Sequence, residues 1–183
     1  MSTPAQQATS AVQAQLGSGA LAGNWTLDPS RSTVGLRSKS MWGLAPVKGS
    51  FRQVSGRGTV SAAGEVSGRI EISAASVDTG NAKRDKHLRS VDFFLSDKYP
   101  VITFDLDRLS VTGDGVTAAG TLTVRERSQR LTFPATASVA GDGEVVLDAT
   151  VEVNRTDFGL TWNQLGMAST QNTITIHAVF TRS

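Results

Sequence analysis

Apolar and polar residues alternate along most of the chain from Asn24 onward, which is the period of a β-strand with one buried face. In the second half of the chain this alternation predicts strands over residues 102–106, 116–124, 131–139, 145–153 and 174–180. In the first half it predicts strands over residues 24–27, 32–38, 47–60 and 66–73. The strand over 47–60 is long, and we expect it to bend at Gly56 or Gly58, as strands do at the corners of barrels.

Glycine-rich turns separate these strands. The tripeptide GDG occurs at residues 113–115 and again at 141–143, and AAG occurs at 62–64. Glycine and aspartate tolerate the backbone conformations of tight turns, so each of these segments predicts a hairpin.

One segment interrupts the β pattern. Residues 82–89 (AKRDKHLR) are good helix formers, and bulky apolar residues follow at 91–95. We expect a short helix over 82–89 and a further helical turn over 92–96, ended by Pro100. Eight or nine antiparallel strands with one short helical excursion favour an all-β, up-and-down barrel, and a two-sheet sandwich is the structural alternative.

The first 22 residues differ from the rest in composition. They are mostly Ala, Gln, Ser and Gly, with few large apolar side chains to bury. We therefore expect a flexible tail over residues 1–22, with a short helix over 5–16, followed by a single domain over 23–183.

Composition excludes several classes of protein and of site. The chain has no cysteine, so disulfides, thiolate metal sites and cysteine nucleophiles are absent. Its 18 basic and 16 acidic residues leave a net charge of only +2, and no basic stripe with interleaved aromatics suggests nucleic-acid binding. No run approaches the length of a membrane span, and residues 1–20 lack the pattern of a secretory signal. These features predict a soluble, cytoplasmic protein, with an exported form left open.

The chain offers no persuasive catalytic or metal site. His87 and His177 are far apart and have no ligand-type neighbours at strand or helix spacing, which favours structural or surface roles. Asp105 and Asp107 share one strand face, where such pairs are usually solvated. No nucleophile elbow, phosphate loop or dinucleotide fingerprint is present.

Two features are typical of ligand binding. Several inward positions are small, which leaves room along a barrel axis unless neighbouring Phe and Leu side chains fill it: Ala118, Gly120, Ala135, Ala137, Ala149 and Ala178. A basic cluster at residues 83–89 also precedes an apolar cluster at 91–95, and this pair could receive an anionic head group with an apolar tail. The alternative for the second feature is a solvated helix above an apolar plug.

Several motifs, in order, resemble the YceI-like family of polyisoprenoid-binding, lipocalin-like barrels. They are residues 25–32 (WTLDPSRS), 43–51 (GLAPVKGSF), 77–94 (VDTGNAKRDKHLRSVDFF), 99–104 (YPVITF), 120–124 (GTLTV) and 154–159 (NRTDFG). The resemblance implies an antiparallel, eight-stranded lipocalin-like barrel around a long, narrow pocket for an isoprenoid or similar lipid, without catalysis. Two positions depart from the pattern: Ser40 stands where many members carry histidine, and residues 125–127 (RER) replace a common glycine.

We therefore predict a protein that holds one polyisoprenoid or other long-chain amphiphilic lipid, as a carrier, store or sequestering protein. The side chains expected to line the lumen are Phe104, Leu106, Leu122, Phe133, Leu147 and Val151. Those expected to shape the mouth are Trp42, Phe93, Phe94, Phe158 and Trp162, with Arg84, Lys86 and Arg155 as head-group partners.

Two other classes of function stay open. A barrel with a filled core would be a structural or interaction module, dimeric through strand edges or the helical segment. An enzyme of lipid or stress metabolism would use Asp105, Asp107 or His87. We expect no cofactor, no metal and no catalytic residue set, and a homodimer is left open.

Overall fold

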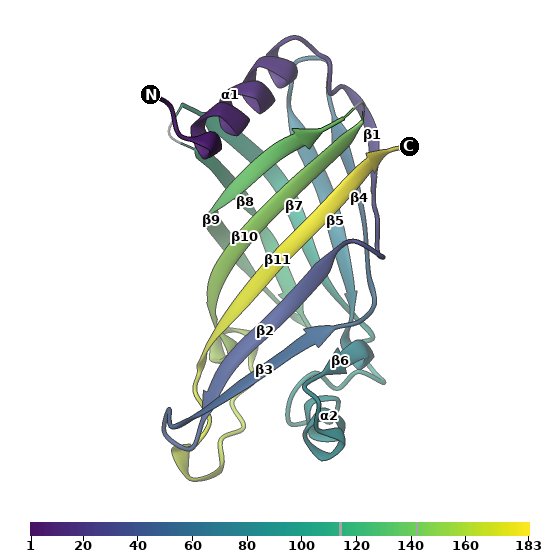
Figure 1. Ribbon diagram of the computed structural model, residues 1–183. Coiled ribbons are helices and arrows are strands. Elements are labelled where there is room, and N and C mark those ends of the chain that lie inside the picture. Colours follow the sequence, from purple (N-terminus) through teal and green to yellow (C-terminus); the bar gives the residue numbers. More distant parts are fainter. Residues whose placement is uncertain (114, 142) are drawn as a thin grey trace.

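The computed structural model describes residues 1–113, 115–141 and 143–183, which form one barrel with a helix at each end (Figure 1). The strands are β1 Gly23–Leu27, β2 Thr33–Ser40, β3 Ala45–Phe51, β4 Val54–Val60, β5 Val66–Ser73, β6 Val77–Asp78, β7 Val101–Thr112, β8 Gly115–Val124, β9 Arg127–Ala140, β10 Glu144–Asn154 and β11 Gln171–Arg182. The helices are α1 Pro4–Gly17 and α2 Ala82–Leu88, with 3₁₀ turns η1 Ala74–Ser76, η2 Arg155–Phe158 and η3 Gln164–Gly166.

Pairing between the first and last strands closes the sheet. Around the barrel the order is β1-β4-β5-β7-β8-β9-β10-β11, every neighbouring pair is antiparallel, and β1 returns to β11 with Trp25 opposite Arg182. The other half of β11 pairs with β2, which continues through β3 to β6. The predicted eight-stranded antiparallel barrel is therefore confirmed.

The predicted hairpins connect neighbouring strands. The turn at residues 62–64 joins β4 to β5, with Val60 opposite Val66. Residues 114 and 142 of the other two predicted turns lie outside the described residues, but the strands beside them pair at Thr112–Gly115 and Ala140–Glu144.

The strand predicted over 47–60 is divided into two strands, and the expected bend at Gly56 or Gly58 stays a prediction. The strand breaks at Arg52 and Gln53, between β3 and β4, because the backbone there bonds to a neighbouring turn instead of a strand. The N–H of Arg52 donates to the carbonyl of Ser76, and the N–H of Gln53 donates to its hydroxyl. Gly56 instead gives Leu27 room, since an added Cβ would lie 3.2 Å from the Leu27 Cβ.

The first helix covers one end of the barrel. Thr3 and Gln6 form a capping box at its start, and the expected short helix near residues 5–16 is present as α1. Val12, Leu16 and Leu21 are buried in the core because they face the barrel from one side of this segment. Residues that the sequence analysis assigned to a flexible tail therefore pack against the barrel. The flexibility of this segment stays a prediction.

The second helix lies at the opposite end of the barrel (Figure 1). The Asn81 side chain caps α2 by accepting from the N–H of Arg84, and the predicted helix over 82–89 is confirmed within one residue. Within the part of the chain that the structure describes, neither helix has the length and apolar character that crossing a membrane requires.

Substituting Gly120 by Ala should destabilise the barrel. A Cβ there would lie 2.2 Å from the carbonyl oxygen of Asp105 and 2.7 Å from the Phe104 ring, so strand or ring must shift. We expect a loss of about 2 kcal/mol in the free energy of unfolding, measured by urea denaturation. Gly17→Ala is the control, because nothing lies within 4 Å of that position, and an equal loss in both variants would contradict this reading.

Acid should weaken the connection between β1 and β2. The Ser30 hydroxyl and the Arg31 guanidinium donate to the Asp28 carboxylate and lower its pKa from 3.8 to about 2. A lowered folded-state pKa stabilises the fold above the unfolded value of about 4 and loses this contribution as the pH falls toward 2. The difference in melting temperature between the wild type and Asp28→Asn should therefore shrink over that interval, and a constant difference would argue against the assignment.

Candidate ligand-binding site

Two cavities lie inside the barrel, one behind the other. The outer cavity has a volume of about 300 Å³ and opens toward α2, and the inner one has about 120 Å³ and lies toward α1. Phe104 and Phe133 line both cavities, with ring centroids 5.5 Å apart. Ile70 and Ile176 also line both, so these four side chains form a partition across the lumen.

Strand register creates the apolar wall of the outer cavity. Leu122 of β8 lies opposite Phe104 of β7, and Val151 of β10 lies opposite Ile174 of β11. Because side chains alternate between the faces of a strand, each such pair points inward together. The other apolar side chains of this wall include Val34, Leu36, Phe51, Ile72, Ile102, Val124, Leu131 and Val153.

The polar side chains of the outer cavity gather at its mouth. Arg84 and His87 come from α2, Arg155 from η2, and Lys39 from the end of β2. No Asp or Glu is among the described residues that line this cavity. The lumen is therefore apolar along its length and basic at its opening.

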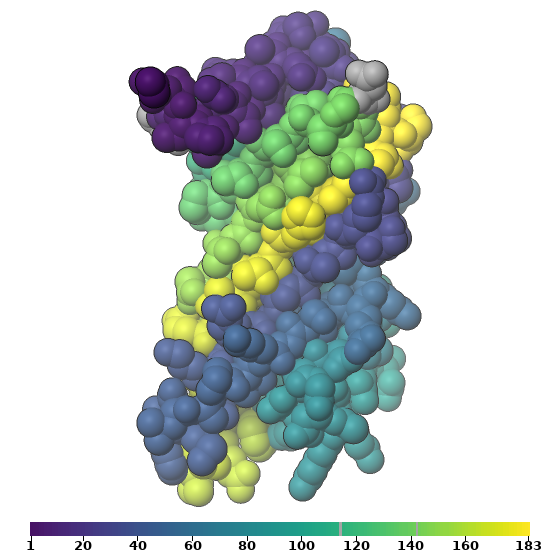
Figure 2. All heavy atoms as spheres, viewed as in Figure 1, coloured from purple at the N-terminus to yellow at the C-terminus, as the bar shows by residue number. Residues whose placement is uncertain are grey.

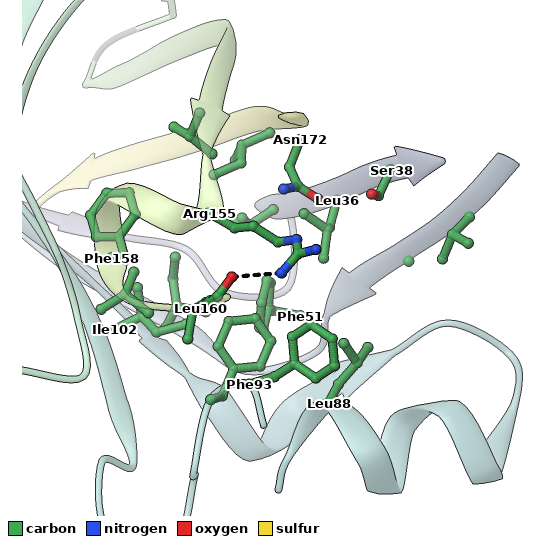
Figure 3. A pocket seen from close by; sticks show the side chains of 18 of the residues that line it. Leu36, Ser38, Phe51, Leu88, Phe93, Ile102, Arg155, Phe158, Leu160 and Asn172 are labelled. Carbon is green, nitrogen blue, oxygen red and sulfur yellow. Dashed lines mark hydrogen bonds between the residues drawn. The ribbon is translucent and has the colours of Figure 1, made fainter. Parts of the chain in front are cut away.

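Arg155 is a buried cation held by backbone carbonyls (Figure 3). Its guanidinium donates to the carbonyl oxygens of Ser169 at 2.9 Å, Leu160 at 2.5 Å and Trp162 at 2.9 Å. Burial lowers the pKa of Arg155 from its ordinary value. This side chain ties the loop over residues 159–170 to the barrel and places a positive charge beside the cavity.

The other two basic groups of the mouth are held by hydrogen bonds on and near α2. The Arg84 guanidinium donates to the hydroxyl and carbonyl oxygens of Thr79, whose N–H and hydroxyl donate to buried Asp85. His87 Nε2 lies 2.7 Å from a carboxylate oxygen of Asp92.

An aromatic cluster joins α2 to the loop on the other side of the mouth. The His87 ring packs edge-on against Trp162 at 4.4 Å and against Phe93 at 5.2 Å between centroids. The guanidinium of Arg155 lies 5.8 Å from the centre of the Phe93 ring. The two sides of the mouth are therefore in direct contact above the cavity.

Arg125 fastens the segment after α2 to the barrel. It stands in the turn between β8 and β9, and its φ of 57° is the left-handed conformation that glycine adopts readily. The guanidinium donates to the carbonyl oxygens of Val91 and Phe93 at 3.1 Å each. The arginine therefore holds the aromatic side of the mouth.

Small side chains and α1 surround the inner cavity. Ala118, Ala135, Ala137, Ala149 and Ala178 line it, as their inward positions in the sequence suggested. Val12, Leu16 and Leu21 cover the end nearest α1. Side chains therefore fill part of the lumen and leave the two cavities open.

The structure brings most of the candidate residues to one of the two cavities. The outer cavity is lined by Phe93, Phe94, Phe104, Leu122, Phe133, Val151, Phe158, Trp162, Arg84 and Arg155. Leu106 and Leu147 line the inner cavity instead. Their role toward a ligand stays a prediction.

Trp42 and Lys86 are not among the described residues that line the two cavities, and their expected roles toward a ligand stay predictions. The Trp42 side chain is exposed at the tip of the β2–β3 hairpin, and Lys86 points to solvent from α2. Sequence reasoning missed His87 as a lining residue, although its position one turn after Lys83 and Arg84 and six residues before Phe93 was the available signal. Ser40 also lines the outer cavity, where its hydroxyl lies 3.4 Å from the carbonyl oxygen of Ala45.

The acidic residues weighed for catalysis face away from the lumen. Asp105 binds Arg69 and Asp107 binds Arg130, both on the outside of the barrel, so the two carboxylates do not act together. His177 lies on the outer face beside Asp148. Among the described residues, no group of three or more His, Cys, Asp or Glu side chains is arranged to hold a metal.

Comparison with known proteins gives a consistent picture. Residues 25–181 match the model of the YceI-like domain. A UPF0312 protein of Staphylococcus aureus is 32% identical over 149 residues, which cover 77% of this chain and 84% of that protein.

Two solved structures share the fold. BcnA of Burkholderia cenocepacia has a TM-score of 0.76 at 23% identity, covering 84% of this chain and 98% of that one. A polyisoprenoid binding domain from Saccharophagus degradans has a TM-score of 0.70 at 17% identity, covering 87% and 98%. At these identities the likeness concerns the fold.

Replacing Arg155 by Met should loosen the loop over 159–170. The substitution keeps much of the side-chain volume but leaves the carbonyl groups of Leu160, Trp162 and Ser169 without their donor. We expect a loss of about 2 kcal/mol or more in the free energy of unfolding and faster amide exchange in that loop.

The exposed arginine Arg130 is the control for this variant. Arg130→Met removes an ion pair with Asp107 on the outer surface. We therefore expect the free energy of unfolding to fall by about 0.5 kcal/mol or less and amide exchange in the loop to stay unchanged. Similar effects of the two substitutions would show that the buried bonds of Arg155 do not hold the mouth.

Proposed function

Because the chain belongs to the YceI-like family, we propose that it binds one polyisoprenoid or similar long-chain amphiphilic lipid in its barrel. The observation that carries the proposal is the polarity of the outer cavity, which is apolar along its wall and basic at its mouth. An extended lipid has the same division, with an apolar chain and one polar end. Its chain would lie between the strands and its head group beside α2.

Burial of the chain would provide most of the affinity. Each methylene group removed from water contributes about 0.8 kcal/mol, so even partial enclosure stabilises a complex without strong polar contacts. The volume of about 300 Å³ is at the lower end of the range of small-molecule pockets, and displacement of Phe104 or Phe133 would join it to the inner cavity.

The head group would meet positive charge at the mouth. Arg155 is buried without a carboxylate partner among the described residues, so its charge would act on a nearby electron-rich group even though carbonyls occupy its donors. Arg84 and His87 would contribute from α2. This arrangement favours a head group rich in oxygen over a cationic one.

We propose a carrier, storage or sequestering role without catalysis. The polyisoprenoid-binding neighbour from Saccharophagus degradans supports the lipid class through its shared fold. The two cavities favour ligand binding over the alternative of a module with a filled core. The outward orientation of Asp105 and Asp107 removes the main reason for considering an enzyme.

Filling the outer cavity should abolish lipid uptake while keeping the fold. Val151 points into the cavity, so Val151→Phe adds an aromatic ring where the chain would lie. Protein purified without detergent and mixed with a polyprenyl lipid should show a one-to-one complex by native mass spectrometry, and Val151→Phe should reduce it at least about tenfold.

The neighbouring position on the same strand provides the control. Thr150 lies on the outer face of β10, so Thr150→Phe should bind like the wild type. A wild-type protein that is empty and takes up no lipid, or two variants that bind equally, would count against binding in this cavity. Circular dichroism of both variants checks that the barrel is intact.

A further inference from the structure

Four large apolar side chains are exposed together at the open end of the barrel. Met41, Trp42 and Leu44 stand at the tip of the β2–β3 hairpin, and Leu165 stands in the adjacent loop. Trp42 is 68% exposed, Leu44 83% and Leu165 78%. We call these four residues the apolar rim.

Backbone hydrogen bonds hold the hairpin and the loop beside each other. The N–H of Trp42 donates to the carbonyl of Met167 at 3.2 Å, and the N–H of Ser169 donates to the carbonyl of Lys39 at 2.9 Å. In Figure 2 the blue spheres of the hairpin lie next to the yellow-green spheres of the loop, at the end of the molecule opposite α1. The apolar rim is therefore a single surface that projects beyond the barrel.

The backbone of the apolar rim is strained. Met41, Trp42 and Leu165 have φ values of 51°, 54° and 54°, in the left-handed region that is unfavourable for residues other than glycine. A left-handed conformation at such residues has a cost that persists where the surrounding structure imposes it, and it is concentrated at functional sites. Here this conformation directs large apolar side chains toward solvent.

Basic residues surround the apolar rim. The sequence from residue 29 to residue 64 contains six Lys or Arg and no Asp or Glu. Arg37, Lys39 and Lys48 are exposed on the hairpin itself, where Arg37 lies opposite Lys48. Lys83 and Lys86 are exposed on α2, at the same end of the barrel.

The apolar rim borders the mouth of the outer cavity. Lys39, Ser40 and Val47 line the cavity from the hairpin, and Ala168 and Ser169 line it from the loop. A surface that covered the apolar rim would therefore lie directly beside the opening.

We propose that the apolar rim docks on the surface of a bilayer that contains anionic lipids, with the mouth of the barrel facing the membrane. The proposal rests on the lipid-binding function proposed above and adds the surface from which the ligand is exchanged. Tryptophan and leucine enter the boundary between head groups and acyl chains, and lysine and arginine around them attract anionic head groups. The protruding shape of the apolar rim fits insertion between lipids better than a flat protein interface, and the excess of positive charge matches the anionic surface.

Co-sedimentation with vesicles tests the proposal. The 183-residue protein is mixed with phosphatidylcholine vesicles that contain 30% phosphatidylglycerol, and with vesicles of phosphatidylcholine alone. We expect binding to the anionic vesicles that weakens at high salt. The double variant Trp42→Ser/Leu44→Ser should lower the partition coefficient about tenfold or more.

Two controls make the result specific. Val101→Ser removes an exposed apolar side chain from the barrel wall at the start of β7, and it should bind vesicles like the wild type. Brominated lipids should quench the fluorescence of wild-type protein more than that of Trp42→Ser, because Trp42 enters the bilayer.

The outcomes separate this proposal from the function on which it rests. The apolar-rim variant should still form the one-to-one lipid complex in native mass spectrometry, and Val151→Phe should still bind vesicles. Absence of vesicle binding by the wild type, or equal binding by the apolar-rim variant, would overturn the docking proposal. Loss of a dimer in that variant, with vesicle binding unchanged, would assign the surface to a second copy of the chain and would overturn it as well.

Discussion

An eight-stranded barrel encloses a little more space than its inward side chains fill, and the features of this molecule follow from that constraint. Strand alternation makes the interior apolar, and the small residues near α1 leave an inner cavity of about 120 Å³. The large rings of Phe104 and Phe133 occupy the middle and leave an outer cavity of about 300 Å³ beyond them. Among the described residues, the charged side chains that line the outer cavity lie at its opening, where α2 and the loop over 159–170 meet.

Order at the opening depends on cations that bond to backbone carbonyls. Arg155 donates hydrogen bonds to carbonyl groups of the loop over 159–170 on one side of the opening. Arg125 does the same for the segment after α2 on the other side. The two irregular segments then contact each other through His87 and Trp162. Because a carbonyl carries no net charge, the loop over 159–170 is fixed without neutralising the guanidinium group of Arg155, and this side of the mouth keeps its positive charge.

The sequence predicted what depends on alternation and local propensity. The positions of most strands, the helix over 82–89 and the inward orientation of residues such as Val151 all follow from periods of two and from helix-forming composition. Tertiary features were harder to predict. The break at residues 52–53 arises from bonds to Ser76, a residue more than twenty positions away, and the exposure of Trp42 arises from a strained hairpin tip. Arg155 was expected beside a head group because it is basic, but the carbonyls that occupy its donors become neighbours only when the loop folds back.

The pairing of β11 has a consequence for synthesis of the protein. Both β1 and β2 have one edge that pairs with β11, and these edges stay unpaired until residues 171–182 have been made, although β1 also pairs with β4 and β2 with β3. Until then two sheet edges and an apolar interior face water, and such edges are prone to pair with other chains. A truncation that removes β11 would therefore be far more damaging than its length suggests, because the barrel closes only through the pairing of β11 with β1.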